Sequence, residues 1–117
     1  MSLRTPQTQA KYDAFKMSDM LSLPCFLCVK EDVSYGAWKL VKNKFPYDLI
    51  ALPETHFLFC PQRHVAEEIE LNEHEISERE RIIRHLLSTT FSCMMLNFGP
   101  ARTHKTHLHY HVWVNKS

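Results

Sequence analysis

The sequence predicts an α+β fold, a meander of five strands with one main helix and a short N-terminal helix. Five short segments alternate apolar and polar side chains with the period of two that is typical of half-buried strands. One longer segment has helical spacing and begins with a capping box. The chain has 117 residues, of which 44% are hydrophobic. This length suits a single domain over residues 1–117 that can bury a core.

Composition excludes several classes of function. Fourteen Lys and Arg residues balance thirteen Asp and Glu residues, for a formal charge of +1, which gives no electrostatic basis for binding nucleic acid or a membrane surface. No apolar run is long enough to span a bilayer, and the first residues lack the apolar centre of a secretory signal. We therefore expect a cytoplasmic protein whose four cysteines are thiols or metal ligands rather than disulfides. Only two glycines occur, which excludes Gly-rich phosphate loops.

The first element expected is a short amphipathic helix, because Tyr12, Phe15 and Met20 have near-helical spacing. Pro24 should end it, and we assign it no chemistry. Cys25 and Cys28 follow directly. Two cysteines three positions apart can ligate one ion from a tight turn, form a redox pair, or pack in the core, and the sequence alone leaves these alternatives equally open.

Strands are expected next at residues 37–43, 48–52 and 56–60, separated by turns at 43–46 and 53–54. Pro61 cannot donate to a ladder, so the third strand should end there or lie at an edge.

The main helix should begin after Asn72, because Asn72 and Glu75 have the spacing of a capping box. Its expected apolar side and solvated side follow from helical periodicity. The apolar side comprises Ile76, Ile83, Leu86 and Leu87, and the solvated side comprises Glu78, Arg81 and His85. A fourth strand is expected at 91–97, with its methionines as core filler.

Residues 107–114 form the most informative segment. Histidines occupy every second position, at His107, His109 and His111. Between and after them stand Leu108, Tyr110, Val112 and Val114. On a strand, the three imidazoles would therefore share one face. Because the histidine pKa lies near neutrality, neighbouring imidazoles can serve as nucleophile, acid, base and metal ligand. A structural row on an exposed sheet face is the alternative, and three histidines in strict alternation favour a functional site.

Residues 107–113 fit the His-φ-His-φ-His-φ-φ signature, φ being apolar, and thereby resemble the histidine triad (HIT) family. Residues 43–46 resemble the ribose-side turn of that family, and residues 56–65 resemble its Gly-His-x-Leu-φ-x-Pro-x-x-His-φ segment. Residues 97–100 resemble the turn after its fourth strand. The resemblance covers roughly residues 25–114. It implies a HIT-like fold, an antiparallel five-stranded sheet with a long helix that is commonly dimerised, and hence a homodimer.

The resemblance implies a nucleotide-binding hydrolase or transferase acting at the α-phosphorus of a nucleotide-containing small molecule. His109 would be the nucleophile and would form a covalent nucleotidyl-histidine, for which its second ring nitrogen must be held by an acceptor. His111 would contact the phosphate and act as a proton partner. Asn43 would lie on the ribose side, and Asn97 would contact a phosphate oxygen.

The resemblance also implies a structural zinc ion (Zn2+). Several HIT proteins, and the related galactose-1-phosphate uridylyltransferases, have a Cys-x-x-Cys pair near the start, and two histidines complete their metal site. Carried over by position, the ligands here are Cys25, Cys28, His64 and His107. Two thiolates and two imidazoles make a closed tetrahedral site.

The segment before the triad differs from the family's pattern. Many members have a small polar run such as Gly-Gln-Ser/Thr, where this chain has Arg102-Thr103-His104-Lys105-Thr106. We expect Arg102, His104 and Lys105 to hold phosphate by charge instead.

Two alternatives to the enzyme with a structural zinc stay open. The first is a non-catalytic, zinc-stabilised module with the same fold that binds nucleotide or protein. The second is a metal-dependent enzyme in which the histidine row holds the catalytic ion while Cys25 and Cys28 only pack.

Overall fold

The structure, a computed structural model, describes residues 2–19, 25–98 and 106–116. Five strands form one sheet in the order β1-β2-β3-β5-β4, and every neighbouring pair is antiparallel. The strands are β1 (Val33–Tyr35), β2 (Trp38–Lys42), β3 (Phe57–Pro61), β4 (Cys93–Met95) and β5 (Tyr110–Trp113). The five-stranded antiparallel sheet is therefore confirmed. The simple meander is wrong, because β5 inserts between β3 and β4.

The helices also follow the sequence prediction in outline. The N-terminal helix is confirmed, whereas Met20 and the predicted stop at Pro24 lie outside the described residues. The capping box is also confirmed: Glu75 N–H donates to Asn72 Oδ1 over 2.8 Å, and Asn72 N–H donates to Glu75 Oε1 over 2.9 Å. The main helix is a continuous run whose middle turn, η2, is a π-helix. The helical elements are α1 (Pro6–Asp19), α2 (Phe26–Val29), η1 (Glu68–Glu70), α3 (Glu73–Ile82), η2 (Ile83–Leu87) and α4 (Ser88–Thr90).

The predicted strand at residues 48–52 is wrong. This segment forms turns, and only Ala51 makes an isolated bridge, to Asn115. The Asp48 carboxylate accepts hydrogen bonds from Thr5 and Thr8, which holds the segment against the N-terminal arm instead of in the sheet. The missing strand is β1, which the sequence analysis did not predict.

The strands at the end of the chain are shorter than predicted. The fourth covers Cys93–Met95 instead of 91–97, and the ladder of the fifth begins at Tyr110 instead of at His107. The alternation of side chains nevertheless continues through the extended residues before Tyr110. Leu108 belongs to the same core cluster as Tyr110 and Val112.

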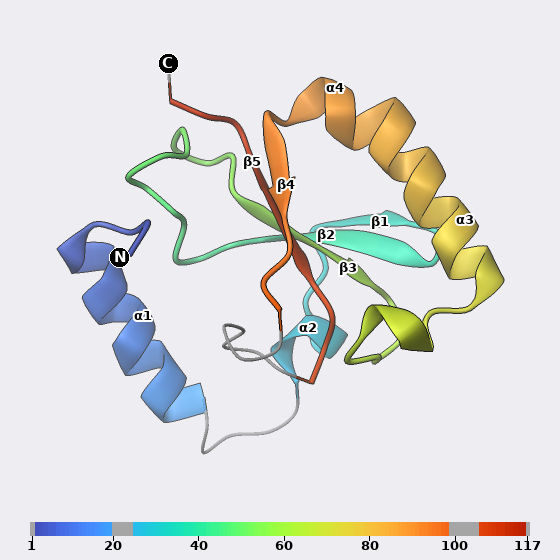
Figure 1. The fold of residues 1–117 in the computed structure, drawn as a ribbon. Helices are drawn as coiled ribbons and strands as arrows, with labels where there is room; N and C mark the ends of the chain where they lie inside the picture. Colours follow the sequence, from blue (N-terminus) through green and yellow to red (C-terminus); the bar gives the residue numbers. More distant parts are fainter. Residues whose placement is uncertain (1, 20–24, 99–105, 117) are drawn as a thin grey trace.

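The sheet is covered on both faces (Figure 1). The main helix packs on one face, where its Ile82 and Leu87 meet Trp38, Phe59 and the apolar residues of the last strand. The short helix α2 covers part of the opposite face through Leu27, which packs with Val41, Leu58 and Cys60. The histidines alternate with the helix-facing residues, so they lie on the α2 side of the sheet. Because both faces are covered, the histidine row is buried rather than half-buried.

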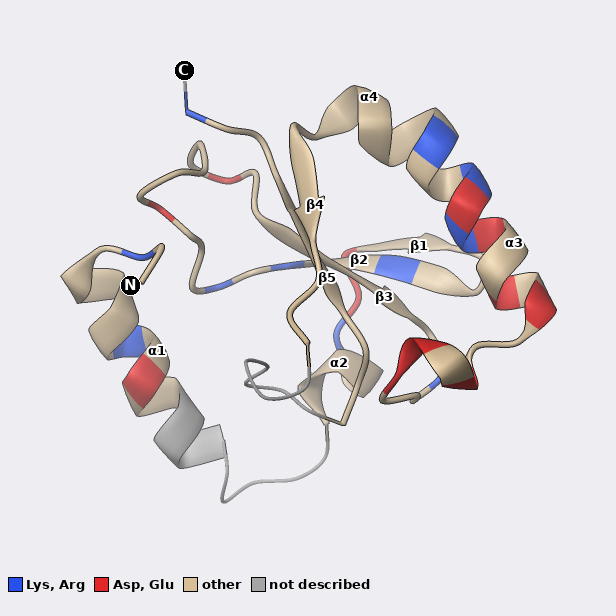
Figure 2. Cartoon of the chain, in the orientation of Figure 1, with Lys and Arg blue, Asp and Glu red and all other residues tan. Residues whose placement is uncertain are grey.

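One expected feature of the main helix is wrong. Glu78, predicted on the solvated side, is only 7% exposed, and its Oε1 accepts a hydrogen bond from Ala37 N–H over 2.5 Å. Ile76, predicted on the apolar side, is 38% exposed. The other predicted apolar residues, Ile83, Leu86 and Leu87, do pack against the core. Glu78 is buried because its carboxylate binds the turn between β1 and β2. The remaining charges of both signs lie along its length (Figure 2).

No helix within residues 2–19, 25–98 and 106–116 is both long enough and apolar enough to cross a bilayer.

Candidate metal centre and histidine row

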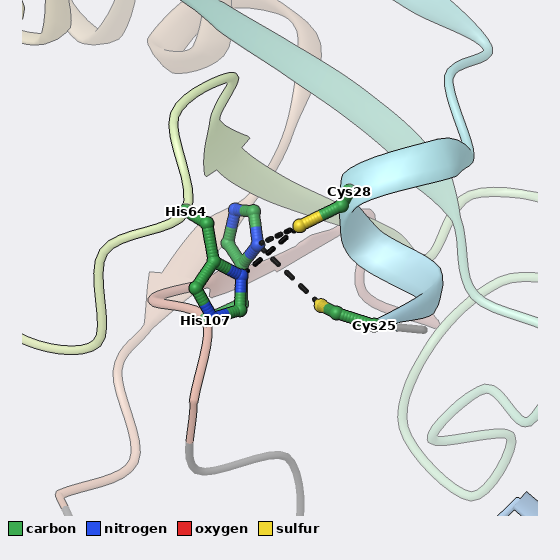
Figure 3. Close-up of side chains that lie close together, drawn as sticks. All are labelled: Cys25, Cys28, His64 and His107. Carbon is green, nitrogen blue, oxygen red and sulfur yellow. Dashed lines mark hydrogen bonds between the residues drawn. The ribbon is translucent and has the colours of Figure 1, made fainter. Parts of the chain in front are cut away.

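Cys25, Cys28, His64 and His107 converge at one end of the sheet (Figure 3). The cysteines come from either end of the one-turn helix α2, where Cys28 N–H donates to Cys25 O. His64 follows β3, and His107 precedes β5. The four ligand atoms lie within 4.8 Å of one another. This cluster could therefore bind a metal ion.

The distances in the cluster suit tetrahedral coordination. Cys28 Sγ lies 3.0 Å from His64 Nδ1 and 3.5 Å from His107 Nδ1, and Cys25 Sγ lies 3.6 Å from His107 Nδ1. Zinc bonds of about 2.3 Å to sulfur and about 2.0 Å to nitrogen at a tetrahedral angle give a sulfur–nitrogen separation of about 3.5 Å. Two of the three sulfur–nitrogen distances therefore match tetrahedral coordination, and the one between Cys28 and His64 is shorter.

A hydrogen bond outside the cluster orients the His107 ring. His107 Nε2 lies 2.9 Å from the carbonyl oxygen of Pro61. Since a carbonyl can only accept, Nε2 carries the proton, and the lone pair of Nδ1 points towards the cysteines. A backbone acceptor behind a ligating histidine is the usual support of a metal site.

The alternative of a redox pair fits less well. None of the four cysteines, each within the described part of the chain, forms a disulfide. Burial raises the pKa of the Cys25 thiol above its ordinary value, whereas a reactive redox cysteine needs a lowered pKa. A raised pKa disfavours the thiolate unless a nearby cation compensates, as a bound metal would.

The histidine row is joined by a residue to which the sequence analysis gave no role, His56. The backbone N–H of Tyr47 donates to His56 Nδ1 over 2.9 Å, so the proton of the His56 ring lies on Nε2. That nitrogen is 2.9 Å from His111 Nδ1, which must then accept. The proton of His111 is therefore on Nε2, 3.4 Å from the Tyr47 hydroxyl. Backbone geometry thus determines both tautomers.

The two histidines of this pair stay neutral. Burial, assisted by the nearby Arg4 charge, lowers the pKa of His56 to about 3. Burial is also the main cause that lowers the pKa of His111 to about 2, with smaller contributions from His109, His56 and Arg4. Near pH 7, His111 is consequently a neutral N–H donor and not a cation.

His109 lies between His107 and His111 and is 6% exposed. Its Nδ1 is 3.0 Å from the backbone oxygen of His107. Its ring meets that of His111 edge to face, with centroids 5.3 Å apart. The acceptor on the second ring nitrogen, which nucleophilic attack requires, is therefore present.

An open cleft of about 410 Å³ lies beside the row. It is lined by Ser2, Leu3, Arg4, Gln9, Tyr47, Met95 and Asn97. Tyr47 connects the cleft to the row, because its ring stacks on His111 at 4.9 Å and 18°. His109 is not among the lining residues.

The structure brings together only some of the predicted site residues. Asn97 lines the cleft, where it forms a hydrogen bond with Tyr47. Asn43 lies next to His56, but its Oδ1 accepts the N–H of Phe45 and so shapes the turn at 43–46. Three predicted phosphate ligands lie outside the described residues, namely Arg102, His104 and Lys105.

Sequence reasoning missed His56, Tyr47 and Arg4 as site residues. His56 stands in the segment that resembles the family's Gly-His-x-Leu motif, which was a usable signal. Tyr47 and Arg4 have no such signal, because only the folded chain places them beside β5.

No known protein-family model matches this chain, and no curated protein sequence matches it.

Proposed function

We propose that this chain is a nucleotide-binding hydrolase or nucleotidyltransferase of the histidine triad type. His109 is its nucleophile at the α-phosphorus of a nucleotide conjugate. The hydrogen bond between His109 Nδ1 and the His107 carbonyl, 3.0 Å long, carries the proposal. It holds the ring proton on Nδ1 and leaves the lone pair on Nε2, the tautomer that attacks phosphorus.

The reaction has two displacements. First, His109 Nε2 bonds to the α-phosphorus while the bond from phosphorus to the leaving group breaks, and the leaving group takes a proton from solvent. Water then attacks the same phosphorus, the bond to Nε2 breaks, and a nucleoside monophosphate leaves. The water gives its proton to solvent. In a transferase, another acceptor hydroxyl replaces water in the second displacement.

The remaining residues bind and orient. His111 donates its Nε2–H to a phosphoryl oxygen as a neutral group, because its pKa is lowered to about 2 by burial and neighbouring charges. Asn97 contacts phosphate from the cleft, and Asn43 lies on the ribose side. Arg102, His104 and Lys105 hold phosphate by charge.

We further propose that the Cys and His cluster holds zinc, because two thiolates and two imidazoles with tetrahedral spacing suit that ion best. Four protein ligands leave no coordination position for water, so the ion would be structural. It would attach α2 to the extended segment that carries His107 and His109. Since the cluster includes His107 but not His109 or His111, a catalytic ion in the row is less well supported.

One observation favours a second candidate, a non-catalytic binding module. His109 is only 6% exposed, and the cleft beside it is lined by Tyr47 and Asn97 but not by His109. A protein that binds nucleotide without turnover would need no access to His109.

The test is the release of nucleoside monophosphate from adenylated and guanylated phosphoramidates and dinucleotide polyphosphates. We expect turnover by the wild type and a loss of about a thousandfold or more in His109→Ala, as for removal of a covalent nucleophile. His85→Ala, at an exposed histidine of the main helix, is the control and should retain full activity. Nucleotide binding without turnover by any variant would establish the binding module and reject the enzyme.

A further inference from the structure

The N-terminal arm, residues 2–9, is held by polar contacts against the turn segment at residues 45–49. Thr5 N–H and the Thr8 hydroxyl donate to the Asp48 carboxylate over 2.7 and 2.6 Å. Leu49 N–H donates to Leu3 O over 3.1 Å. The arm therefore forms a wall of the cleft even though it lies far from the other site residues in sequence.

Arg4 is the functional group that this arm brings to the cleft. Its Nε donates to Phe45 O over 2.6 Å, and its guanidinium carbon lies 4.1 Å from the ring centroid of Tyr12 and 4.8 Å from that of Tyr47. Tyr47 in turn stacks on His111. Arg4 and His111 therefore both contact the ring of Tyr47.

The charge of Arg4 has no counter-ion in the part of the chain that the structure describes. Its contacts there are the carbonyl of Phe45 and the two tyrosine rings, and no carboxylate joins it. Arg4 is also the one charged residue among those that line the cleft. A partly buried arginine next to an open cleft with no acidic group attracts an anion, and its fork of N–H groups suits phosphate.

We propose that Arg4 binds a phosphate in the leaving group of the substrate, which makes polyphosphate-linked nucleotides the preferred substrate class. This inference rests on the proposed function, because it concerns the group that leaves when His109 attacks the α-phosphorus. His111 and Asn97 contact the phosphate under attack, and Arg4 contacts the next one. Phosphoramidates, which lose an uncharged amine, gain nothing from Arg4.

Two substrates with the same nucleoside test the proposal, diadenosine triphosphate and adenosine 5′-phosphoramidate. In Arg4→Gln we expect kcat/KM for the triphosphate to fall about tenfold or more, mainly through KM, as for loss of a charged hydrogen bond. The value for the phosphoramidate should change less than about twofold. Arg4→Lys should recover only part of the loss, because it keeps the charge but not the fork of N–H groups.

Thr8→Val is the matched control. It removes one contact between the arm and Asp48 but keeps the cation, so it should not change the ratio of the two kcat/KM values. An equal fall for both substrates in Arg4→Gln, or no fall for the triphosphate, would show that Arg4 is only structural and overturn the proposal.

A binding measurement separates this inference from the proposed function. Inorganic pyrophosphate should bind the wild type and His109→Ala equally and bind Arg4→Gln about tenfold more weakly. If no variant turns over a nucleotide but this pattern holds, the proposed enzyme fails and the anion site stands. If turnover depends on His109 but pyrophosphate binding does not depend on Arg4, the enzyme stands and the anion site is rejected.

Discussion

At the scale of single residues, the site depends on ring protons that the backbone positions. Tyr47 N–H determines the tautomer of His56, and His56 determines that of His111. The His107 carbonyl does the same for His109. The row therefore has defined donors and acceptors before any ligand binds, which is the pre-organisation that catalysis needs.

The burial of His56 predicts how the free energy of unfolding depends on pH. The pKa of His56 is lowered from 6.5 to about 3, so unfolded His56 binds protons that the folded form excludes between these values. The stability that neutral His56 contributes is complete above about pH 6.5 and is lost as the pH falls towards 3, by roughly 1.4 kcal/mol per pH unit at most.

In His56→Gln we expect the free energy of unfolding to fall less steeply between pH 6.5 and 4.5 than in the wild type, as measured by urea denaturation. His85→Gln is the control, because His85 is exposed. Parallel pH profiles for wild type and His56→Gln would contradict the prediction.

At the scale of elements, the turn between β1 and β2 lies directly against the main helix. Gly36 has a φ of 62°, and a Cβ there would lie 2.2 Å from Glu78 Oε1. Glu78 in turn accepts the N–H of Ala37. A side chain at this position is thus disfavoured both by the backbone conformation and by the carboxylate, which would have to move.

Gly36→Ala should lower the free energy of unfolding by about 2–4 kcal/mol. About 1–2 kcal/mol comes from the left-handed backbone, and the rest comes from displacing the carboxylate from the Ala37 N–H. Denaturant unfolding of a double-mutant cycle with Glu78→Ala measures the two parts. In the Glu78→Ala background, Gly36→Ala should cost only the backbone part, and an unchanged cost there would show that Glu78 plays no role.

At the scale of the whole molecule, the metal cluster joins three separate parts of the chain. Its ligands come from α2 and the residue before it, from the segment after β3 and from the segment before β5. A bound ion would therefore cross-link residues 25 and 107 and stabilise the folded state by its binding free energy.

We expect the wild type to contain one zinc per chain by elemental analysis, and chelation to lower Tm by on the order of 10 °C. Cys28→Ser should lose the metal and show the same low Tm without chelator. Cys93→Ser is the matched control, because Cys93 lies outside the cluster and should keep both metal and Tm. Full zinc content in Cys28→Ser would reject this ligand set.

The sequence by itself determined the elements whose signal is local. The capping box placed the start of the main helix, because Asn72 and Glu75 bond to each other's backbone within one turn. The alternation at residues 107–112 separated helix-facing from histidine-side residues, because successive side chains of an extended chain point to opposite faces. The convergence of Cys25, Cys28, His64 and His107 also followed from the sequence, through the family resemblance.

Only the tertiary structure decided the contacts between distant segments. Strand order, the burial of Glu78 and the failure of the strand at 48–52 each depend on a partner that sequence periodicity does not specify. Tyr47 reaches the histidine row because its ring stacks on that of His111. Arg4 reaches Tyr47 because the arm binds Asp48. These contacts join residues about forty or more positions apart. Periodicity indicates which face of its own helix or strand a side chain occupies. Which other segment packs against that face depends on tertiary packing and on the pairing of charges.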